Sequence, residues 1–308
     1  MELLRHTSEF RDHQPSSVVT IGVFDGVHRG HREIIRRCVD MARKAGLPAV
    51  VLTFERNPKE MVSGRRTCVL NAPSKKLQLI ESLGVDFVIT ERFSRRFASR
   101  SPSDFCREVL AGDLGARVVC VGEDFRFGAH AAGDVATLEV EGGKFGFELE
   151  VVKLVSAGGV RVSSTLIREL IREGKVHEVE EALGRAYSLE GRVVHGHSRG
   201  KRLGFPTANL KLSRHFCLPP DGVYAGKAWM GGERYICAVN KGSNPTFGDR
   251  HSALEVFLLN FNGDIYGEKM EVEFHCRLRN EVAFPDEQGL IKQMEEDVRR
   301  VREFFAGR

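Results

Sequence analysis

Apolar runs rich in β-branched residues recur at intervals of about thirty residues through the first part of the chain. Helical patterns separate the first four runs, and strand, helix and strand at this spacing predict right-handed βαβ units in a parallel sheet. Ligands of such α/β sheets bind beyond the carboxyl ends of the strands, so functional residues are expected directly after the runs. The predicted strands are Ser17–Phe24, Ala49–Phe54, Val85–Thr90, Arg117–Gly122 and Phe147–Val155.

The pattern changes in the second part of the chain, after a short predicted helix over Lys175–Leu183. Strands follow one another there without helices, and Gly231-Gly232 and Asn262-Gly263 are typical of the turns between them. This organisation predicts an antiparallel β-barrel followed by a terminal helix over Asp286–Phe305, whose apolar stripe packs on a core. The predicted strands are Tyr187–His195, Gly222–Met230, Arg234–Asn240, Leu254–Asn260 and Lys269–Arg277.

Length and charge agree with two globular domains that act on small molecules. The chain has 308 residues, which corresponds to about two domains, and we place the predicted boundary between residues 185 and 186. The formal charge of +4 divides into +2 on each side of that boundary. Nucleic-acid-binding proteins concentrate basic residues in one arm or face, so small polyanions such as nucleotides are the favoured ligands. The sequence gives no sign of an obligate protein partner.

Seven cysteines are distributed over the chain without any C-x-x-C spacing. This odd number predicts a reduced protein with buried or incidental thiols, and neither a disulfide framework nor a zinc site. No run approaches the ~18 uncharged apolar residues of a membrane span, and the N-terminal residues lack the apolar core of a signal peptide. We therefore expect a cytoplasmic protein that does not enter a membrane.

The segment 22–31 follows the first predicted strand and leads into a helix. Gly22 and Gly26 let the backbone approach a ligand closely, and the helix N-terminus offers free N–H groups and a favourable dipole to a phosphate. His28 and His31 can both face that phosphate and donate hydrogen bonds to charge that develops on phosphorus. Two exposed histidines on a capped helix are the alternative. A zinc site is disfavoured because no third ligand stands at a usual spacing.

Two more segments with polar or aromatic residues follow predicted strands. After the fourth strand, Asp124 can hold a ribose or a ring N–H, while Phe125 and Phe127 either offer a flat apolar surface to a ligand or pack into the core. After the fifth strand, Ser163-Ser164-Thr165 can cap a helix. Arg168 follows one turn later, where it can grip a polyphosphate.

The loop 197–209 is the segment of the second part whose residue types best suit the binding of a ligand. Its glycines and basic residues, Lys201 among them, suit a phosphate cradle, although a solvated turn is the common alternative. The loop is not a Walker A motif, because Gly196 and Gly200 are one residue too close. The neutral oxygens of Thr207 and Asn209 can bind Mg²⁺ together with ATP phosphates.

Glu255 is a carboxylate within an otherwise apolar predicted strand, where a charged residue is unexpected. A catalytic role would explain it. The alternative is simple alternation, in which Glu255 points to solvent while Leu254 and Val256 point inward.

The motifs G-x-F-D-G-V-H-x-G-H, G-x-D-F-x-F-G and S-S-T-x-I-R occur in this order, followed by G-F-P-T-A-N, N-x-G-x-x-P-T-F and D-I-Y-G. Together they resemble the prokaryotic bifunctional riboflavin kinase/FAD synthetases. The resemblance implies a Rossmann-like nucleotidyltransferase domain over residues 1–185 and a β-barrel riboflavin kinase domain over residues 186–308. It also implies that ATP phosphorylates riboflavin to FMN, and that a second ATP adenylylates FMN to FAD with release of pyrophosphate.

The resemblance assigns roles to single residues, with Mg²⁺ as the implied metal. The implied catalytic residues are Glu255 as the kinase base, with His28, His31 and Arg168 in adenylyl transfer. The implied metal ligands are Thr207 and Asn209. The implied flavin-binding residues are Asn57, Asp124, Phe125 and Phe127. The implied nucleotide-binding residues are Gly22, Phe24, Asp25, Gly26, Ser164, Thr165, Gly200, Lys201, Gly204 and Pro206.

One departure from the family pattern follows the second predicted strand. The family reads T-F-x-P-H-P, whereas Arg56 and Asn57 replace the Pro-His pair in this chain. Asn57 can donate a hydrogen bond to a phosphate but cannot carry a proton charge, and Arg56 restores a positive charge nearby. Two alternatives follow: a kinase with an inactive first domain, disfavoured by the intact H-x-G-H motif, and a flavin-sensing nucleic-acid binder, disfavoured by the evenly divided charge.

Overall fold

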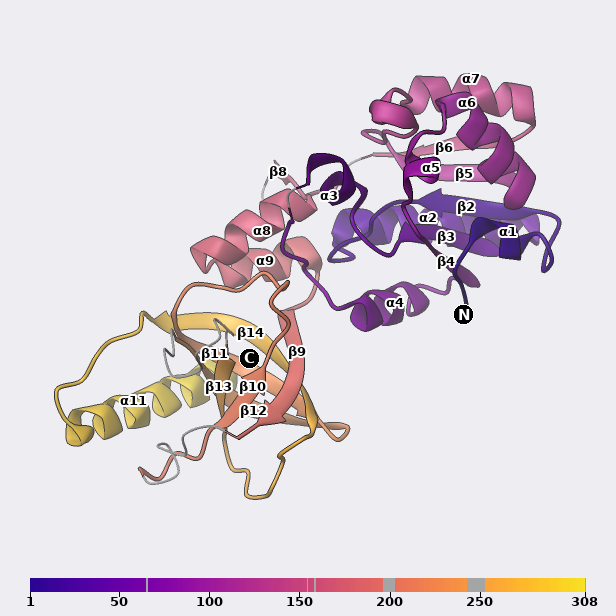
Figure 1. Cartoon of the computed structure of the whole chain (residues 1–308). Coiled ribbons are helices and arrows are strands. Elements are labelled where there is room, and N and C mark those ends of the chain that lie inside the picture. Colours follow the sequence, from indigo (N-terminus) through magenta and orange to yellow (C-terminus); the bar gives the residue numbers. More distant parts are fainter. Residues whose placement is uncertain (65, 154, 158, 196–202, 243–252, 308) are drawn as a thin grey trace. The chain divides into compact units, whose positions relative to one another are not determined.

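A computed structural model describes residues 1–64, 66–153, 155–157, 159–195, 203–242 and 253–307 (Figure 1). The chain forms two compact units. The first comprises Met1–Thr67 and Pro73–Ser163, and the second comprises Cys68–Ala72 and Ser164–Arg308. Contacts therefore divide the chain after Ser163, whereas the division of the two activities between residues 185 and 186 stays a prediction.

The first unit is built on a six-stranded sheet in which every pair of neighbours is parallel, as the spacing of the apolar runs predicted. Its strands are β1 (Glu2–Leu4), β2 (Ser17–Ile21), β3 (Ala49–Phe54), β4 (Phe87–Glu91), β5 (Ala116–Gly122) and β6 (Glu148–Val152). They lie in the order β1-β4-β3-β2-β5-β6. The edge strand β1 escapes prediction because three residues are too few to show an alternating pattern.

Helices pack on both faces of this sheet. The helical elements are α1 (Thr7–Phe10), α2 (Arg29–Ala45), α3 (Pro58–Ser63), α4 (Pro73–Glu81), α5 (Arg95–Ala98), α6 (Pro102–Asp104), the π-helix η1 (Phe105–Asp113), the 3₁₀ turn η2 (Ala129–Ala131) and α7 (Val135–Phe145). Alternate residues of β2 point to opposite faces of the sheet. Val19 and Ile21 pack in a hydrophobic core with residues of η1 and α7, and Val18 packs with residues of α2. The short strands β7 (Ser156–Ala157) and β8 (Val160–Arg161) form a separate hairpin.

Helix α2 has well-defined caps at both ends. His28 is the N-cap residue, and its side chain accepts a hydrogen bond from the backbone N–H of His31. Gly46 ends the helix in the left-handed conformation and donates to the carbonyls of Ala42 and Arg43. Seven residues separate the end of β2 from the start of this helix, which therefore begins at the carboxyl edge of the sheet.

The second unit contains a closed antiparallel barrel, as predicted. Its strands are β9 (Tyr187–Val194), β10 (Ala208–Lys211), β11 (Gly222–Met230), β12 (Glu233–Lys241), β13 (Ala253–Leu258) and β14 (Lys269–Arg279). The order around the barrel is β10-β13-β12-β11-β14-β9, and β10 closes it by pairing with β9. Ala208 and Asn209 of β10 were predicted as part of the loop 197–209, and Leu210 and Lys211 were assigned to no strand; the segment Ala-Asn-Leu-Lys carries little β-propensity.

In the described part of this unit there are also the helices α8 (Ser164–Glu173), α9 (Val176–Leu183) and the terminal α11 (Glu287–Ala306). The predicted terminal helix is confirmed, with Asp286 as its N-cap. Val298, Val301 and Phe305 of α11 pack against outward-facing side chains of the barrel, including Phe257. The helix thus covers one side of the barrel wall, and Arg279 anchors it through a bidentate ion pair with the buried Asp297, at 2.7–3.1 Å.

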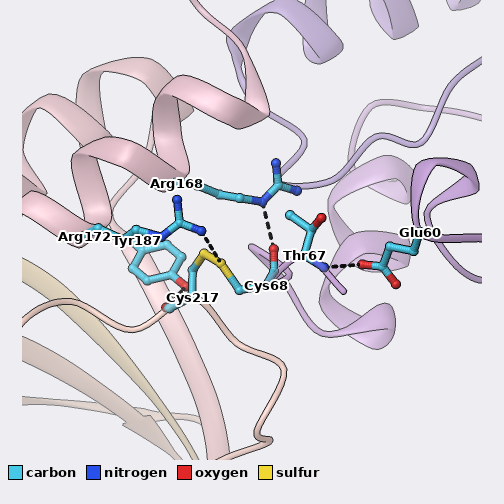
Figure 2. Close-up of a disulfide and its surroundings, with 7 residues drawn as sticks. All are labelled: Glu60, Thr67, Cys68, Arg168, Arg172, Tyr187 and Cys217. Carbon is cyan, nitrogen blue, oxygen red and sulfur yellow. Dashed lines mark hydrogen bonds between the residues drawn. A yellow bond between two sulfur atoms is a disulfide. The ribbon is translucent and has the colours of Figure 1, made fainter. Parts of the chain in front are cut away.

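The cysteines differ from the expectation. Cys68 and Cys217 form a disulfide across a sequence separation of 149 residues, with their Cα atoms 4.9 Å apart (Figure 2). The expectation of reduced thiols alone is therefore wrong for this pair, while Cys38, Cys106, Cys120, Cys237 and Cys276 form no disulfide. Spacing cannot predict such a bond, since the folded chain alone brings residues 68 and 217 together.

Residues 68–72, which we call the strap, lie against the second unit although the chain on either side of them belongs to the first. Val69 forms an isolated parallel bridge with Phe216, and its backbone exchanges hydrogen bonds with His215 and Cys217 at 2.7 and 3.0 Å. Leu70 of the strap is fully buried. The strap is therefore held by main-chain pairing, apolar burial and one covalent bond.

Gly115 offers a test of the turn that leads into β5. A Cβ at this position would lie 2.2 Å from the carbonyl oxygen of Pro15, and its φ of +52° is unfavourable for other residues. We expect Gly115→Ala to lower the free energy of unfolding by about 2 kcal/mol or more, measured by urea denaturation with circular dichroism.

Gly143→Ala is the matched control, because Gly143 lies inside α7 and a Cβ there meets no atom within 4 Å. We expect this variant to be neutral or more stable by up to about 1 kcal/mol. Equal stabilities of the two variants would contradict the described geometry of the turn.

Candidate functional site

The strand order of the first unit reverses between β2 and β5, the position at which open α/β sheets form a ligand-binding crevice, which we call the β2/β5 crevice. The chain moves from β2 to β3 and β4 on one side, and from β5 to β6 on the other, so β2 and β5 flank a topological switch point. Open α/β sheets bind ligands at the carboxyl ends of the strands beside such a point. Segments 22–31 and 123–128 follow β2 and β5, and Asn57 follows the neighbouring β3. The sheet therefore gathers three of the predicted motif segments at one edge.

The backbone after β2 adopts conformations that are rare for the residues involved. Phe24 has φ +51° and Val27 has φ +40°, on either side of Gly26 at φ +86°. A β-branched residue at positive φ is a genuine outlier, and such strain accumulates at ligand-binding sites. Phe24 and Val27 are also almost fully buried, which holds the segment in this shape.

His28 and His31 lie face to face at the start of α2. Their ring centroids are 3.6 Å apart with an interplanar angle of 19°, and Phe24 contacts His31 edge-on at 5.2 Å. A side chain at Gly30 would bring its Cβ to 3.3 Å from the His28 ring, so glycine is favoured there. His28 Nδ1 accepts the His31 backbone N–H at 3.3 Å, which requires its proton to be on Nε2. The two histidines are therefore brought together as predicted from the motif.

His31 is held as a neutral imidazole. Burial, together with the nearby His28 and Lys76, keeps the pKa of His31 well below its usual range. Its Nδ1 is buried and has no hydrogen-bond partner among the described residues. A partly buried, neutral ring of this kind can donate one hydrogen bond to a ligand without bringing a charge of its own.

Lys76 of α4 is a residue that the sequence analysis missed. Its ammonium group donates to the Val23 carbonyl at 3.4 Å, the Thr53 hydroxyl at 3.1 Å and the Phe54 carbonyl at 3.2 Å, which joins the ends of β2 and β3. Burial lowers the pKa of Lys76 to about 8, while Asp25 acts in the opposite direction. A signal was present, since Lys76 stands one helical turn before the buried Ile80 and so faces inward.

The aromatic pair after β5 divides between core and surface. Phe127 is 7% exposed and packs in the core, and Gly133 pairs with its backbone in both directions. Phe125 stacks on Phe127 at 5.6 Å but keeps part of its ring accessible. Asp124 is exposed and forms an ion pair with Arg161. Of the pair, Phe125 thus has a ring surface that a ligand can contact, and the buried ring of Phe127 packs against it.

Ser164, Thr165 and Arg168 lie on α8, which belongs to the second unit by its contacts. Arg168 is 7% exposed, and its Nε donates to the carbonyl oxygen of Cys68 in the strap at 2.8 Å (Figure 2). Asn57 directly precedes α3 in the first unit, and its carbonyl accepts the N–H of Glu60 at 2.9 Å. The joint action of these residues with the two histidines stays a prediction.

In the barrel, strand register places three polar residues side by side. Glu255 of β13 stands directly opposite Asn209 of β10 on one side and Asn240 of β12 on the other. Directly opposed residues share a face of the sheet, with Cβ atoms about 4.5–5.5 Å apart. Leu254 and Val256 point into the barrel and are buried, so this polar row lies on the outer face of the wall.

The predicted alternation of β13 is therefore present, yet Glu255 is half-buried instead of fully exposed. Phe205 accounts for part of the burial of Glu255. Its ring contacts the ring of Phe257 edge-on on the same outer face, with the ring centroids 5.4 Å apart. The segment that carries Gly204, Pro206 and Thr207 thus approaches the polar row. Of the predicted nucleotide-binding residues, Gly200 and Lys201 lie outside the described residues.

Within the described ranges, no three His, Cys, Asp or Glu side chains are grouped so as to hold a metal ion. The same part of the chain contains no helix long and apolar enough to cross a membrane.

Comparisons with known proteins identify the family to which each half of the chain is similar. Residues 10–166 match a family model described as FAD synthetase, and residues 183–305 match one described as riboflavin kinase. The bifunctional riboflavin kinase/FMN adenylyltransferase of Escherichia coli K12 is 38% identical over 294 residues, which covers 95% of this chain and 94% of the relative. The enzyme of the same name from Listeria monocytogenes is 36% identical over 295 residues, covering 94% and 93%.

A solved structure from Streptococcus pneumoniae, described as a macrolide-efflux protein, shares the fold with a TM-score of 0.88. It is 31% identical and covers 98% of this chain and 99% of its own. Two family models in tandem, together with relatives that match over nearly the full length, establish both activities: formation of FMN from riboflavin and ATP, and of FAD from FMN and ATP with release of pyrophosphate. The chain belongs to the bifunctional riboflavin kinase/FMN adenylyltransferase family.

Proposed function

We propose that riboflavin is phosphorylated at the polar row of the barrel, with Glu255 as the general base. The register that sets Glu255 between Asn209 and Asn240 is the observation that carries this assignment. Glu255 accepts the proton of the riboflavin 5′-hydroxyl as that oxygen attacks the γ-phosphate of ATP. Positioning and charge neutralisation then provide most of the catalysis, as in other phosphoryl transfers.

The residues around Glu255 fit Mg²⁺. The amide oxygen of the buried Asn209 and the hydroxyl of Thr207 are hard, neutral ligands of the kind that Mg²⁺ accepts beside phosphate oxygens. When bound, the ion neutralises charge on the ATP phosphates. Asn209 and Thr207 hold and orient it, and Glu255 remains available for proton transfer.

We further propose that adenylyl transfer takes place at the β2/β5 crevice. The phosphate of FMN attacks the α-phosphate of ATP, and pyrophosphate leaves. A phosphate monoester is already an anion, so the protein supplies no nucleophile. His28 donates from Nε2 and the N-terminus of α2 offers its free N–H groups to the phosphate, while Arg168 grips the polyphosphate.

The flavin is proposed to lie against Phe125, with Asp124 at a ring N–H or ribose and Asn57 at the FMN phosphate. Phe125 keeps a partly exposed ring, and Asp124 is exposed beside it. Lys76 adds a positive charge near Asp25 at the same edge of the sheet. The ammonium group of Lys76 donates to the carbonyl of Phe54, three residues before Asn57, which replaces the family histidine. The working ligands are small molecules in both sites, and a cytoplasmic location with no nucleic-acid partner remains part of the proposal.

Substitution of Glu255 tests the kinase assignment. We expect Glu255→Gln to lower FMN formation from riboflavin by about 10²–10⁴-fold, because the amide cannot accept the proton. FAD formation from supplied FMN should not change. Chromatography of the flavins measures both. Glu233→Gln, at an exposed position of β12, is the control. A normal kinase rate in Glu255→Gln would show that Glu255 is not the general base.

Removal of the two stacked histidines tests the adenylylation site. We expect His28→Ala with His31→Ala to lower FAD formation from FMN by at least about 10²-fold and to leave riboflavin phosphorylation unchanged. The control is His13→Ala with His130→Ala, which removes two exposed rings from the same unit. Normal FAD output from the first double variant would exclude the crevice as the site.

The low pKa of His31 predicts a pH dependence of stability. Below about pH 6.5 the imidazole of the unfolded chain takes up a proton that the folded chain resists. The contribution of His31 to the free energy of unfolding is therefore fully present above that pH. It declines as the pH falls, by at most about 1.4 kcal/mol per pH unit. The difference in unfolding free energy between wild type and His31→Gln should shrink between pH 7.5 and 5.5. His177→Gln, at an exposed position, serves as the control; parallel curves for wild type and His31→Gln would contradict a depressed pKa.

A further inference from the structure

The strap of residues 68–72 connects covalently to elements of both proposed reactions. The chain leaves the first unit at Thr67 and returns to it at Pro73, the first residue of the helix that carries Lys76. The disulfide joins Cys68 to Cys217, which lies in the connection between β10 and β11. The bond therefore determines whether the strap is tied to the second unit or held there by weaker contacts alone.

The backbone of the strap orients Arg168. The carbonyl of Cys68 accepts the Nε–H of Arg168 at 2.8 Å, and the arginine is 7% exposed. Figure 2 shows the two terminal nitrogens of this guanidinium directed away from the carbonyl. A planar guanidinium held at Nε has little freedom to rotate, so the position of the Cys68 carbonyl determines where the terminal N–H groups point.

The two sulfurs of the bond have different surroundings. Cys217 is 2% exposed, and the hydroxyl of the buried Tyr187 donates to its carbonyl at 2.5 Å. Cys68 is partly exposed, and a terminal nitrogen of Arg172 approaches its Sγ at 3.6 Å (Figure 2). A neighbouring guanidinium stabilises a thiolate that forms on Cys68. Access therefore makes Cys68 the sulfur that an external thiolate attacks first, and the guanidinium stabilises the Cys68 thiolate when the second step displaces it.

We propose that the Cys68–Cys217 bond is a redox-sensitive device that positions Arg168 for adenylyl transfer. In the oxidised chain the strap holds the Cys68 carbonyl on Arg168, and reduction loosens this support and slows FAD formation. The inference rests on the proposed role of Arg168. In a reducing compartment, disulfides of this kind are usually transient and responsive to redox conditions.

The exchange with a dithiol reductant balances as follows. A thiolate of the reductant attacks Cys68 Sγ, the protein disulfide breaks, and its electron pair passes to Cys217 Sγ, which takes up a proton. The second thiol of the reductant then attacks the mixed disulfide and displaces Cys68 as a thiolate. The protein gains two electrons, and the reductant ends as a disulfide.

The first experiment compares the full chain before and after reduction with dithiothreitol. Thiol titration under denaturing conditions should find five thiols in the oxidised form and seven in the reduced form. FAD formation from FMN should fall on the order of five- to tenfold on reduction, chiefly through KM for ATP, since loss of positioning weakens the grip on the polyphosphate. Riboflavin phosphorylation should change less than about twofold. Oxidation should restore both the thiol count and the rate.

Three outcomes would overturn the proposal: seven thiols after oxidation, equal FAD rates in the two forms, or a rate change that does not follow the thiol count. Cys68→Ser and Cys217→Ser should each show the rate of the reduced enzyme and no response to dithiothreitol. Cys276→Ser, which removes a free thiol, should respond like wild type. Retained redox response in Cys68→Ser would also refute the assignment.

The variant Arg168→Lys distinguishes a failure of the redox proposal from a failure of the proposed role of Arg168 in adenylyl transfer. Normal FAD formation by this variant would remove Arg168 from the adenylylation site, whatever the disulfide does. Strong loss in Arg168→Lys, combined with equal rates for oxidised and reduced wild type, would leave the role of Arg168 intact and refute the redox device alone.

Discussion

Main-chain hydrogen bonding between neighbouring strands is the constraint on which both sites depend. In the first unit, parallel pairing of β2 with β3 and β5 brings the carboxyl ends of three strands to one edge. In the barrel, antiparallel pairing of β13 with β10 and β12 sets Glu255 between two asparagines. A slip of one residue in either ladder would turn these side chains to the opposite face and dismantle the site.

Close packing and desolvation then adapt the β2/β5 crevice to anion chemistry. The small Gly30 admits the His28 ring, and the stacked His31 is kept neutral by burial and by two basic neighbours. Lys76 contributes a buried cation at the same edge while tying the ends of two strands together. Charge and strain are thus concentrated where a phosphate is expected, in a segment held rigid by the buried Phe24 and Val27.

Most of the architecture could be predicted because its signals are local. The apolar runs predicted five parallel strands, and β3 and β11 match their predicted bounds. Strand β10 could not be predicted, since its four residues owe their conformation to the neighbours that close the barrel. Lys76 was missed because a lysine on a short helix is usually solvated; its spacing from Ile80 indicates an inward-facing side chain, but only the structure shows its three oxygen partners.

The sequence by itself determined the two-part organisation and the order of the motifs, because periodicity and residue spacing are properties of the chain. The family resemblance of those motifs implied the type of chemistry at each. Tertiary structure alone decided which distant residues meet. It brought Cys68 to Cys217 across 149 residues, grouped α8 with the barrel, and placed Asn240 beside Glu255. The physical reason is that such pairings depend on the free energy of the whole fold, in which burial and backbone pairing elsewhere offset the entropy lost in closing long loops.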